Sequence, residues 1–167
     1  MLDHVGVGRA HVVGYSWGGA VAQHLAWRHP VRVDRLVLAA TSVGLGAVPG
    51  VPWAFGPPLI EALTARGPRR ARTSPVGILG QVGAIVTWSS WPFLHRIEAP
   101  TLVLAGTADL VVPALNARLL AWALPDTELA LLAGIGHDVF APAALDTVTP
   151  RLAAFFATGR GRVTPDQ

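Results

Sequence analysis

The stretch Gly14-Tyr15-Ser16-Trp17-Gly18-Gly19 decides the fold of this chain. It follows a β-prone run over residues 9–15, and it precedes a helix-like run over residues 20–27 that ends at His29-Pro30. The G-x-S-x-G sequence therefore lies on a sharp turn between a strand and a helix. A serine in that position is held out of the chain and exposed, which is typical of a nucleophile.

The glycines of this stretch are expected at such a turn for a packing reason. The strained backbone brings Gly14 and Gly18 close together, and Gly19 lets the helix begin against the sheet. Ser16 is then the candidate nucleophile. The alternative is a glycine-rich structural turn, and the two interpretations are separated by whether an acid and a base follow in the required order.

The composition bounds the class of protein. With 167 residues, of which 51% are hydrophobic, the chain is long and apolar enough for one folded domain. It contains no cysteine, which excludes disulfides, thiolate metal sites and a catalytic cysteine. The sequence shows neither a leader peptide at Met1 nor an apolar run as long as a membrane span. We therefore expect a soluble, cytoplasmic protein without a transmembrane segment.

Charge and histidine spacing argue against two further classes of function. The formal net charge is only +3, and no basic stripe with interleaved aromatic residues is present, so we expect no nucleic-acid partner. The 6 histidines are scattered without the spacing of metal ligands, so we expect no metal and no other cofactor. The sequence does not indicate an oligomeric state.

Strand-like and helix-like segments alternate after the motif. Residues 33–41 and 101–105 are near-continuous apolar runs, typical of parallel strands buried on both faces. Helical patterns over residues 113–124 and 143–157 flank a further strand pattern at residues 127–132. This alternation predicts an α/β fold in which helices flank a parallel sheet.

The segment between the two apolar runs has a different composition. Residues 42–95 are rich in Gly, Pro and Trp, which predicts a short cap insertion between units at residues 1–41 and 96–167. The cluster from Arg66 to Arg72 predicts a solvated face rather than a site for acidic products or a granule surface. The aromatic residues of this segment could line a lipophilic acyl site, but we favour ordinary packing for them. They are Trp53, Trp88, Trp91 and Phe93.

A nucleophilic serine needs a histidine as base and a carboxylate to orient that histidine. In a fold of this kind the chain order is serine, acid, histidine. His137 lies in the glycine-flanked loop 134–138, directly after the last predicted strand. Asp109 directly follows the strand at 101–105, at the sheet edge where open α/β sheets place their sites. We therefore predict that Asp109 and His137 complete the site of Ser16.

The other titratable residues fit these roles less well. Asp138 adjoins the predicted base too closely to orient it, Asp126 is in a turn, and Asp146 is on a helix. After the strand at 33–41, no carboxylate occurs before Glu61. Structural or solvated positions are expected for the remaining histidines, which are His4, His11, His24, His29 and His95.

Four stretches, VVGYSWGGA, DRLVLAAT, APTLVLAGTADLVVP and GIGHDVF, resemble the α/β-hydrolase family in this order. More narrowly, GYSWGGAVAQHLA, residues 46–52, WSSWPFLHRI and ALNARLLAWALPDTEL are similar to intracellular poly(3-hydroxyalkanoate) depolymerases. The resemblance implies hydrolysis of an aliphatic polyester, a poly(3-hydroxyalkanoate), or of its oligomers. We therefore expect a cofactor-free serine hydrolase of carboxylic esters that acts on a small ester or polyester substrate through an acyl-enzyme, with depolymerase as the favoured class. It makes Ser16 the nucleophile, Asp109 the acid and His137 the base, with the Trp17 amide as one oxyanion donor. Polyester synthases use a cysteine at the turn, which this chain lacks.

The amino terminus departs from the family pattern. Family members begin with several strands and helices before the turn, including a loop that supplies the second oxyanion donor. Residues 1–7 resemble the end of the helix before the nucleophile strand, so we expect a truncated chain comprising the carboxyl-terminal half of an α/β-hydrolase fold. The edge of the nucleophile strand would be exposed, and one missing oxyanion donor lowers the rate about a hundred- to a thousandfold. The alternatives are a general esterase or lactonase of this fold and a non-catalytic remnant.

Overall fold

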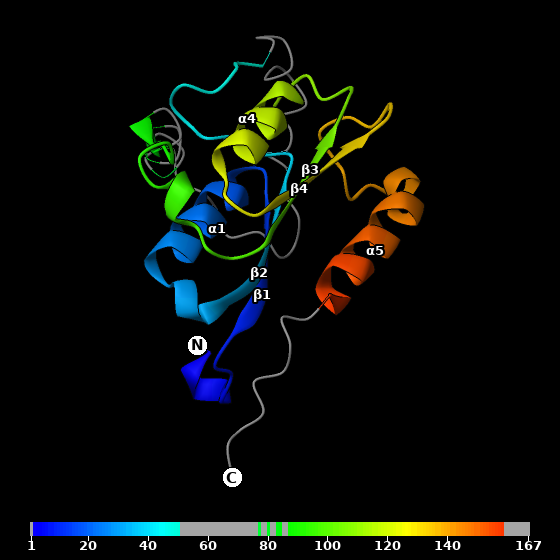
Figure 1. Cartoon of the computed structure of the whole chain (residues 1–167). Coiled ribbons are helices and arrows are strands. Elements are labelled where there is room, and N and C mark those ends of the chain that lie inside the picture. Colours follow the sequence, from blue (N-terminus) through cyan, green and yellow to red (C-terminus); the bar gives the residue numbers. More distant parts are fainter. Residues whose placement is uncertain (1, 51–76, 78–79, 81–82, 85–86, 159–167) are drawn as a thin grey trace.

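A parallel sheet forms the centre of the computed structural model, which describes residues 2–50, 77, 80, 83–84 and 87–158 (Figure 1). The strand order within this part of the chain is β1-β2-β3-β4, and every neighbouring pair is parallel. The carboxyl ends of all these strands therefore meet at one edge of the sheet. The strands are β1 (Ala10–Tyr15), β2 (Val33–Ala39), β3 (Thr101–Gly106) and β4 (Thr127–Leu132).

Helices cover both faces of this sheet. Figure 1 shows α1 (Trp17–Arg28) and α4 (Leu115–Ala123) on one side and α5 (Pro142–Ala157) on the other. Alternate residues of β2 serve the two faces: Leu36 and Leu38 pack with α1 and α4, and Val37 packs with α5. Because both faces are covered, the central strands are apolar at successive positions rather than at alternate ones. The predicted α/β fold with a parallel sheet flanked by helices is confirmed.

The strand that precedes Ser16 is at the edge of the sheet. β1 pairs only with β2 among the described strands, and its exposed residues alternate with partly buried residues and with the buried Gly14. Val13 is 48% exposed, whereas Leu104 in β3 is fully buried. Among the described residues, β1 is therefore the terminal strand of the sheet, with exposed side chains.

Several predicted boundaries are wrong by two or three residues. β2 ends at Ala39 rather than Thr41, because Ala40 has a φ of 47° and turns the chain out of the sheet. α1 begins at Trp17 rather than Ala20, since both glycines after Ser16 belong to its first turn. α4 begins at Leu115 rather than Pro113. Residues 3–5 form a short 3₁₀ turn, capped by Gly6 with a φ of 68°, rather than a helix end.

The described ends of the predicted cap contact each other and α4. Gly44 and Ser89 form an isolated antiparallel bridge, and the Leu45 amide donates to the Trp88 carbonyl at 2.7 Å. The buried Asn116 side chain accepts from the Val48 amide at 2.8 Å and donates to the Val48 carbonyl at 2.9 Å. These bonds hold the start of the segment against the core. Trp53 and the cluster Arg66 to Arg72 lie outside the described residues.

Short 3₁₀ segments join the main elements. They are η1 (Asp3–Val5), η2 (Pro30–Arg32) and η4 (Leu94–Arg96). In the part of the chain that the structure describes, no helix is both long and apolar enough to cross a membrane.

Candidate active site

Ser16 lies at the tip of the turn between β1 and α1 with a strained backbone. Its φ of 50° and ψ of −124° are unusual for a residue with a side chain, and strain of this kind is typical of functional turns. The Ser16 amide donates to the Ala39 carbonyl at 2.9 Å, so β2 fixes the turn against the sheet. This is the strand-turn-helix context that the G-x-S-x-G sequence predicts.

The three glycines of the turn differ in how much space surrounds them. A Cβ on Gly14 would lie 2.6 Å from Ala22 Cβ and 2.7 Å from the Gly18 carbonyl oxygen. A Cβ on Gly19 would clash with the side chain of Thr41. By contrast, a Cβ on Gly18 would meet no described atom within 4 Å. Close packing therefore requires glycine at Gly14 and Gly19, but not at Gly18.

The structure brings Ser16, His137 and Asp109 into one hydrogen-bonded chain. His137 Nε2 lies 3.0 Å from Ser16 Oγ, and His137 Nδ1 lies 2.8 Å from Asp109 Oδ2. With the proton on Nδ1, the imidazole donates to the carboxylate and accepts from the serine hydroxyl. The His137 side chain is 22% exposed and that of Asp109 is fully buried. His137 is thus accessible, whereas the Asp109 carboxylate is shielded from water.

Backbone amides that the sequence reasoning missed hold Asp109 in place. Its Oδ1 accepts from the amides of Val111 and Val112, both at 2.8 Å, which leaves Oδ2 for His137. An aspartate that accepts from the amide two residues later forms an Asx turn. The Asp-Leu-Val-Val sequence after β3 was the available signal, because Asp is one of the residues that form such turns.

The loops that carry the acid and the base are in direct contact. The Ala108 amide donates to the Ile135 carbonyl at 2.9 Å, and the Gly134 amide donates to Thr107 Oγ1 at 2.9 Å. A Cβ on Gly106 would clash with the Ile135 carbonyl, so the backbones approach too closely for a side chain there. The geometry between acid and base is therefore fixed by backbone contacts.

The amino end of α1 is suited to an anionic group. Trp17 is the first residue of the helix, where amide groups have no partner within the helix. The helix dipole adds a partial positive charge at the same end. If Ser16 Oγ bonded to a carbonyl carbon, the oxyanion that develops on the carbonyl oxygen would therefore meet a favourable field, with the Trp17 amide nearest in the chain.

Tyr15 contacts the imidazole of His137 from the end of β1. Their ring centroids are 5.5 Å apart, and Tyr15 also packs edge-on against Phe140 at 5.7 Å. Burial raises the pKa of the Tyr15 phenol, and the nearby charges of Asp138 and Asp109 raise it further. The sequence reasoning did not single out this residue. Asp138 itself accepts from the Phe140 amide at 3.2 Å.

The other histidines have structural partners or lie on the surface. His11 stacks on Phe156 with ring centroids 4.7 Å apart and lies 3.4 Å from Asp34. His24 packs edge-on against Trp27 and Phe93. His4, His29 and His95 are exposed.

Comparison with known proteins identifies the family to which the chain belongs. A family model described as the alpha/beta hydrolase fold matches residues 1–65. A poly(3-hydroxyalkanoate) depolymerase from Ectopseudomonas oleovorans is 36% identical over 97% of this chain and 66% of its own length. A pimeloyl-[acyl-carrier protein] methyl ester esterase from Aromatoleum aromaticum is 30% identical over 78% of this chain and 68% of its own length. The chain belongs to the α/β-hydrolase family.

Solved structures support the same family assignment. A hydrolase from Pseudomonas aeruginosa PA01 is 30% identical, with a TM-score of 0.66 over 93% of this chain and 68% of its own length. This α/β-hydrolase chain spans 66% of the depolymerase and as little as 59% of other curated relatives. The resemblance to the family that the sequence motifs indicated is confirmed.

Proposed function

We propose that this chain is a serine hydrolase that cleaves carboxylic esters. The observation that carries the proposal is the continuous chain from Ser16 Oγ through His137 to the buried Asp109. A serine hydroxyl is a weak nucleophile at neutral pH and needs a base within hydrogen-bond reach. His137 meets that geometric requirement.

The proposed reaction proceeds through an acyl-enzyme. Ser16 Oγ attacks the ester carbonyl while His137 Nε2 takes its proton, and Asp109 stabilises the imidazolium that forms. The Trp17 amide and the amino end of α1 stabilise the oxyanion. His137 then gives the proton to the leaving alkoxide as the C–O bond breaks. Water, activated by the same histidine, hydrolyses the acyl-Ser16 ester and regenerates the hydroxyl.

The proposed substrate class is a poly(3-hydroxyalkanoate) or its oligomers. The chain is 36% identical to a poly(3-hydroxyalkanoate) depolymerase over 97% of its length, which supports this substrate class. A general esterase or lactonase of the same fold is the alternative, and relative rates on short esters, lactones and polymer separate the two. We also propose that residues 42–95 form a cap between the units at residues 1–41 and 96–167. The cytoplasmic location remains a prediction.

One observation favours a second candidate, a non-catalytic remnant. β1 is at the edge of the described sheet, with Val13 48% exposed, although it leads directly to Ser16. Within the described residues β1 pairs with one strand only, and an edge strand leaves a row of backbone N–H and C=O groups without strand partners. On this view, the site residues meet but do not react.

Labelling with a fluorophosphonate probe tests the proposed function. The probe captures only an activated serine, so the wild-type chain should label and the Ser16→Ala and His137→Ala variants should not. His95→Ala is the matched control, because His95 is an exposed histidine outside the site. A folded wild-type chain that stays unlabelled would contradict the proposal and favour the remnant.

A further inference from the structure

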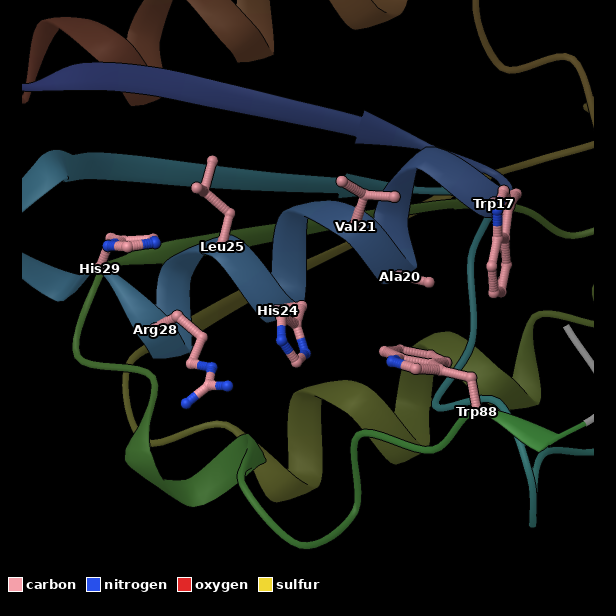
Figure 2. Close-up of a pocket in the computed structure, with 8 residues that line it drawn as sticks. All are labelled: Trp17, Ala20, Val21, His24, Leu25, Arg28, His29 and Trp88. Carbon is pink, nitrogen blue, oxygen red and sulfur yellow. The ribbon is translucent and has the colours of Figure 1, made fainter. Parts of the chain in front are cut away.

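An open groove of about 510 Å³ runs along α1, and apolar side chains line it together with His24, Arg28 and His29. Figure 2 shows Trp17 and Trp88 at one end and His29 at the other. The two tryptophans meet edge to face, with ring centroids 5.9 Å apart. Since Trp17 follows Ser16 directly in the chain, this end of the groove is next to the proposed nucleophile.

Two apolar residues that α1 contributes to the groove, Val21 and Leu25, do not serve the core, whereas Ala20 is buried. Ala22 and Ala26 pack into the core, whereas Val21 is 61% exposed and Leu25 is 38% exposed. An exposed apolar stripe costs free energy in water, and that cost is removed when a ligand covers it. The stripe therefore suits an extended aliphatic chain.

A positive charge lies at the end of the groove far from Ser16. The Arg28 side chain points into the space that His24 and Trp88 also face (Figure 2). Its guanidinium lies 5.0 Å from the centre of the Trp27 ring, which orients it. Within the described residues, no carboxylate lies within ion-pair distance of Arg28. A planar guanidinium without such a partner is a natural site for a carboxylate of a ligand.

The length of the groove sets the length of the ligand. From Trp17 to Arg28, α1 rises about 16 Å at about 1.5 Å per residue. An extended chain advances about 1.2 Å per bond, so roughly a dozen chain atoms cover this distance. Each 3-hydroxyalkanoate unit adds one oxygen and three carbons to the chain, so about three units reach from one end to the other.

We propose that this groove binds the carboxylate-terminated end of a hydroxyalkanoate oligomer of about three units, with Arg28 pairing with the terminal carboxylate. The aliphatic backbone lies along Val21 and Leu25, and the ester to be cleaved lies at the Trp17 end. This inference rests on the proposed function for the reacting end of the ligand. It adds a preference for free oligomer ends over esterified ends.

Equilibrium binding tests the groove without requiring turnover. Isothermal titration calorimetry on the Ser16→Ala chain would measure Kd for the linear trimer of 3-hydroxybutyrate and for its methyl ester, which lacks the terminal charge. We expect the free acid to bind more tightly than the ester. Adding Arg28→Ala should weaken binding of the acid about three- to tenfold and bring it to the level of the ester. Adding Val21→Trp should weaken both ligands by obstructing the stripe.

Matched substitutions elsewhere control for nonspecific effects. Arg118→Ala removes an exposed arginine on α4, and Leu145→Trp enlarges an exposed leucine on α5, so neither should change either Kd. Equal binding of acid and ester, no effect of Arg28→Ala, or no detectable binding of the trimer would overturn the inference. Fluorophosphonate labelling of the wild-type chain is an independent measurement. A chain that labels but shows no Arg28-dependent binding would contradict the groove proposal alone. A chain that does not label but shows Arg28-dependent binding would contradict the proposed function alone.

Discussion

β1 and β3 both lead to a residue of the candidate site, but they are held in different ways. β3 is buried at every position between β2 and β4. Among the described strands, β1 pairs with β2 alone, and it exposes alternate residues. The position of Asp109 after β3 is therefore set by the core. The position of Ser16 after β1 depends on local features: a strained turn, the bond to the Ala39 carbonyl, and glycines that allow close packing.

From this difference we expect the two halves of the candidate site to respond to different substitutions. Substitutions in the core should displace Asp109 and also lower the free energy of unfolding. Substitutions at the turn should move the nucleophile with a smaller loss of stability. The expected effects decrease from the chemistry of the site through core packing and turn packing to local electrostatics.

The largest effect is expected from changing the chemistry of the buried acid. Asp109→Asn keeps the shape of the side chain but cannot hold His137 in the productive tautomer, so kcat on a short ester should fall about 10⁴-fold. Asp138→Asn is the matched control, because it removes the same charge one residue from His137 while its Oδ1 bonds to Phe140. Equal losses in the two variants would contradict the role assigned to Asp109.

Core packing in β3 should matter far more than packing in β1. Leu104 is fully buried, so Leu104→Ala should lower the free energy of unfolding by about 2–5 kcal/mol. Val13 is 48% exposed, so Val13→Ala should change it by about 0.5 kcal/mol or less. Urea unfolding followed by circular dichroism measures both. A Val13→Ala cost as large as that of Leu104→Ala would mean that β1 is covered in solution.

At the turn, the two glycines after Ser16 should behave differently. Gly19→Ala places a methyl group against Thr41 and should cost about 1–3 kcal/mol in the free energy of unfolding. Gly18→Ala places it in open space within the first turn of α1, so stability should stay unchanged or rise by up to about 1 kcal/mol. Comparable destabilisation by both substitutions would contradict the packing described for the turn.

The smallest effect concerns the ionisation of Tyr15, the only tyrosine of the chain. Tyrosinate absorbance should report a pKa above the ordinary 10.0 in the folded chain, because burial, Asp138 and Asp109 disfavour the anion. Since the folded chain binds this proton more tightly than the unfolded chain, the associated stability is present below pH 10 and is lost as pH rises past the raised pKa. Asp138→Asn should lower that pKa without abolishing the shift. An identical titration in folded chain and in urea would contradict the burial of the ring.

Most elements of the fold were predictable from the sequence. The predicted strand at residues 127–132 has the bounds of β4, and those of β1 and β3 differ by one residue. A strand that is covered on both faces has a continuous apolar run, and a strand that is covered on one face has alternating apolar residues. These sequence patterns therefore indicate where the strands are buried. The predicted start of α1 was wrong because the low helix propensity of glycine argued against a helix at Gly18 and Gly19. In the structure Gly19 is required by the close approach of Thr41 and is nevertheless part of the helix.

Within the candidate site, residue types were predictable and their supports were not. The order serine, acid, histidine singled out Ser16, Asp109 and His137 because the chemistry needs those side chains. The anchoring amides of Val111 and Val112 carry no side-chain signal of their own. The two hydrogen bonds between the Asn116 side chain and the Val48 backbone join residues far apart in the chain, so no local pattern predicts them.

The sequence by itself determined the strand-turn-helix at Ser16, the alternation of strands and helices, and the residues with suitable chemistry, because these depend on neighbours along the chain. Only the tertiary structure decided that Ser16 and His137, 121 positions apart, lie within hydrogen-bond distance. It also decided that Trp17 and Trp88 form one end of an apolar groove. The physical reason is the parallel sheet, which brings the carboxyl ends of separate strands to one edge, where close packing of loops sets distances that no local pattern encodes.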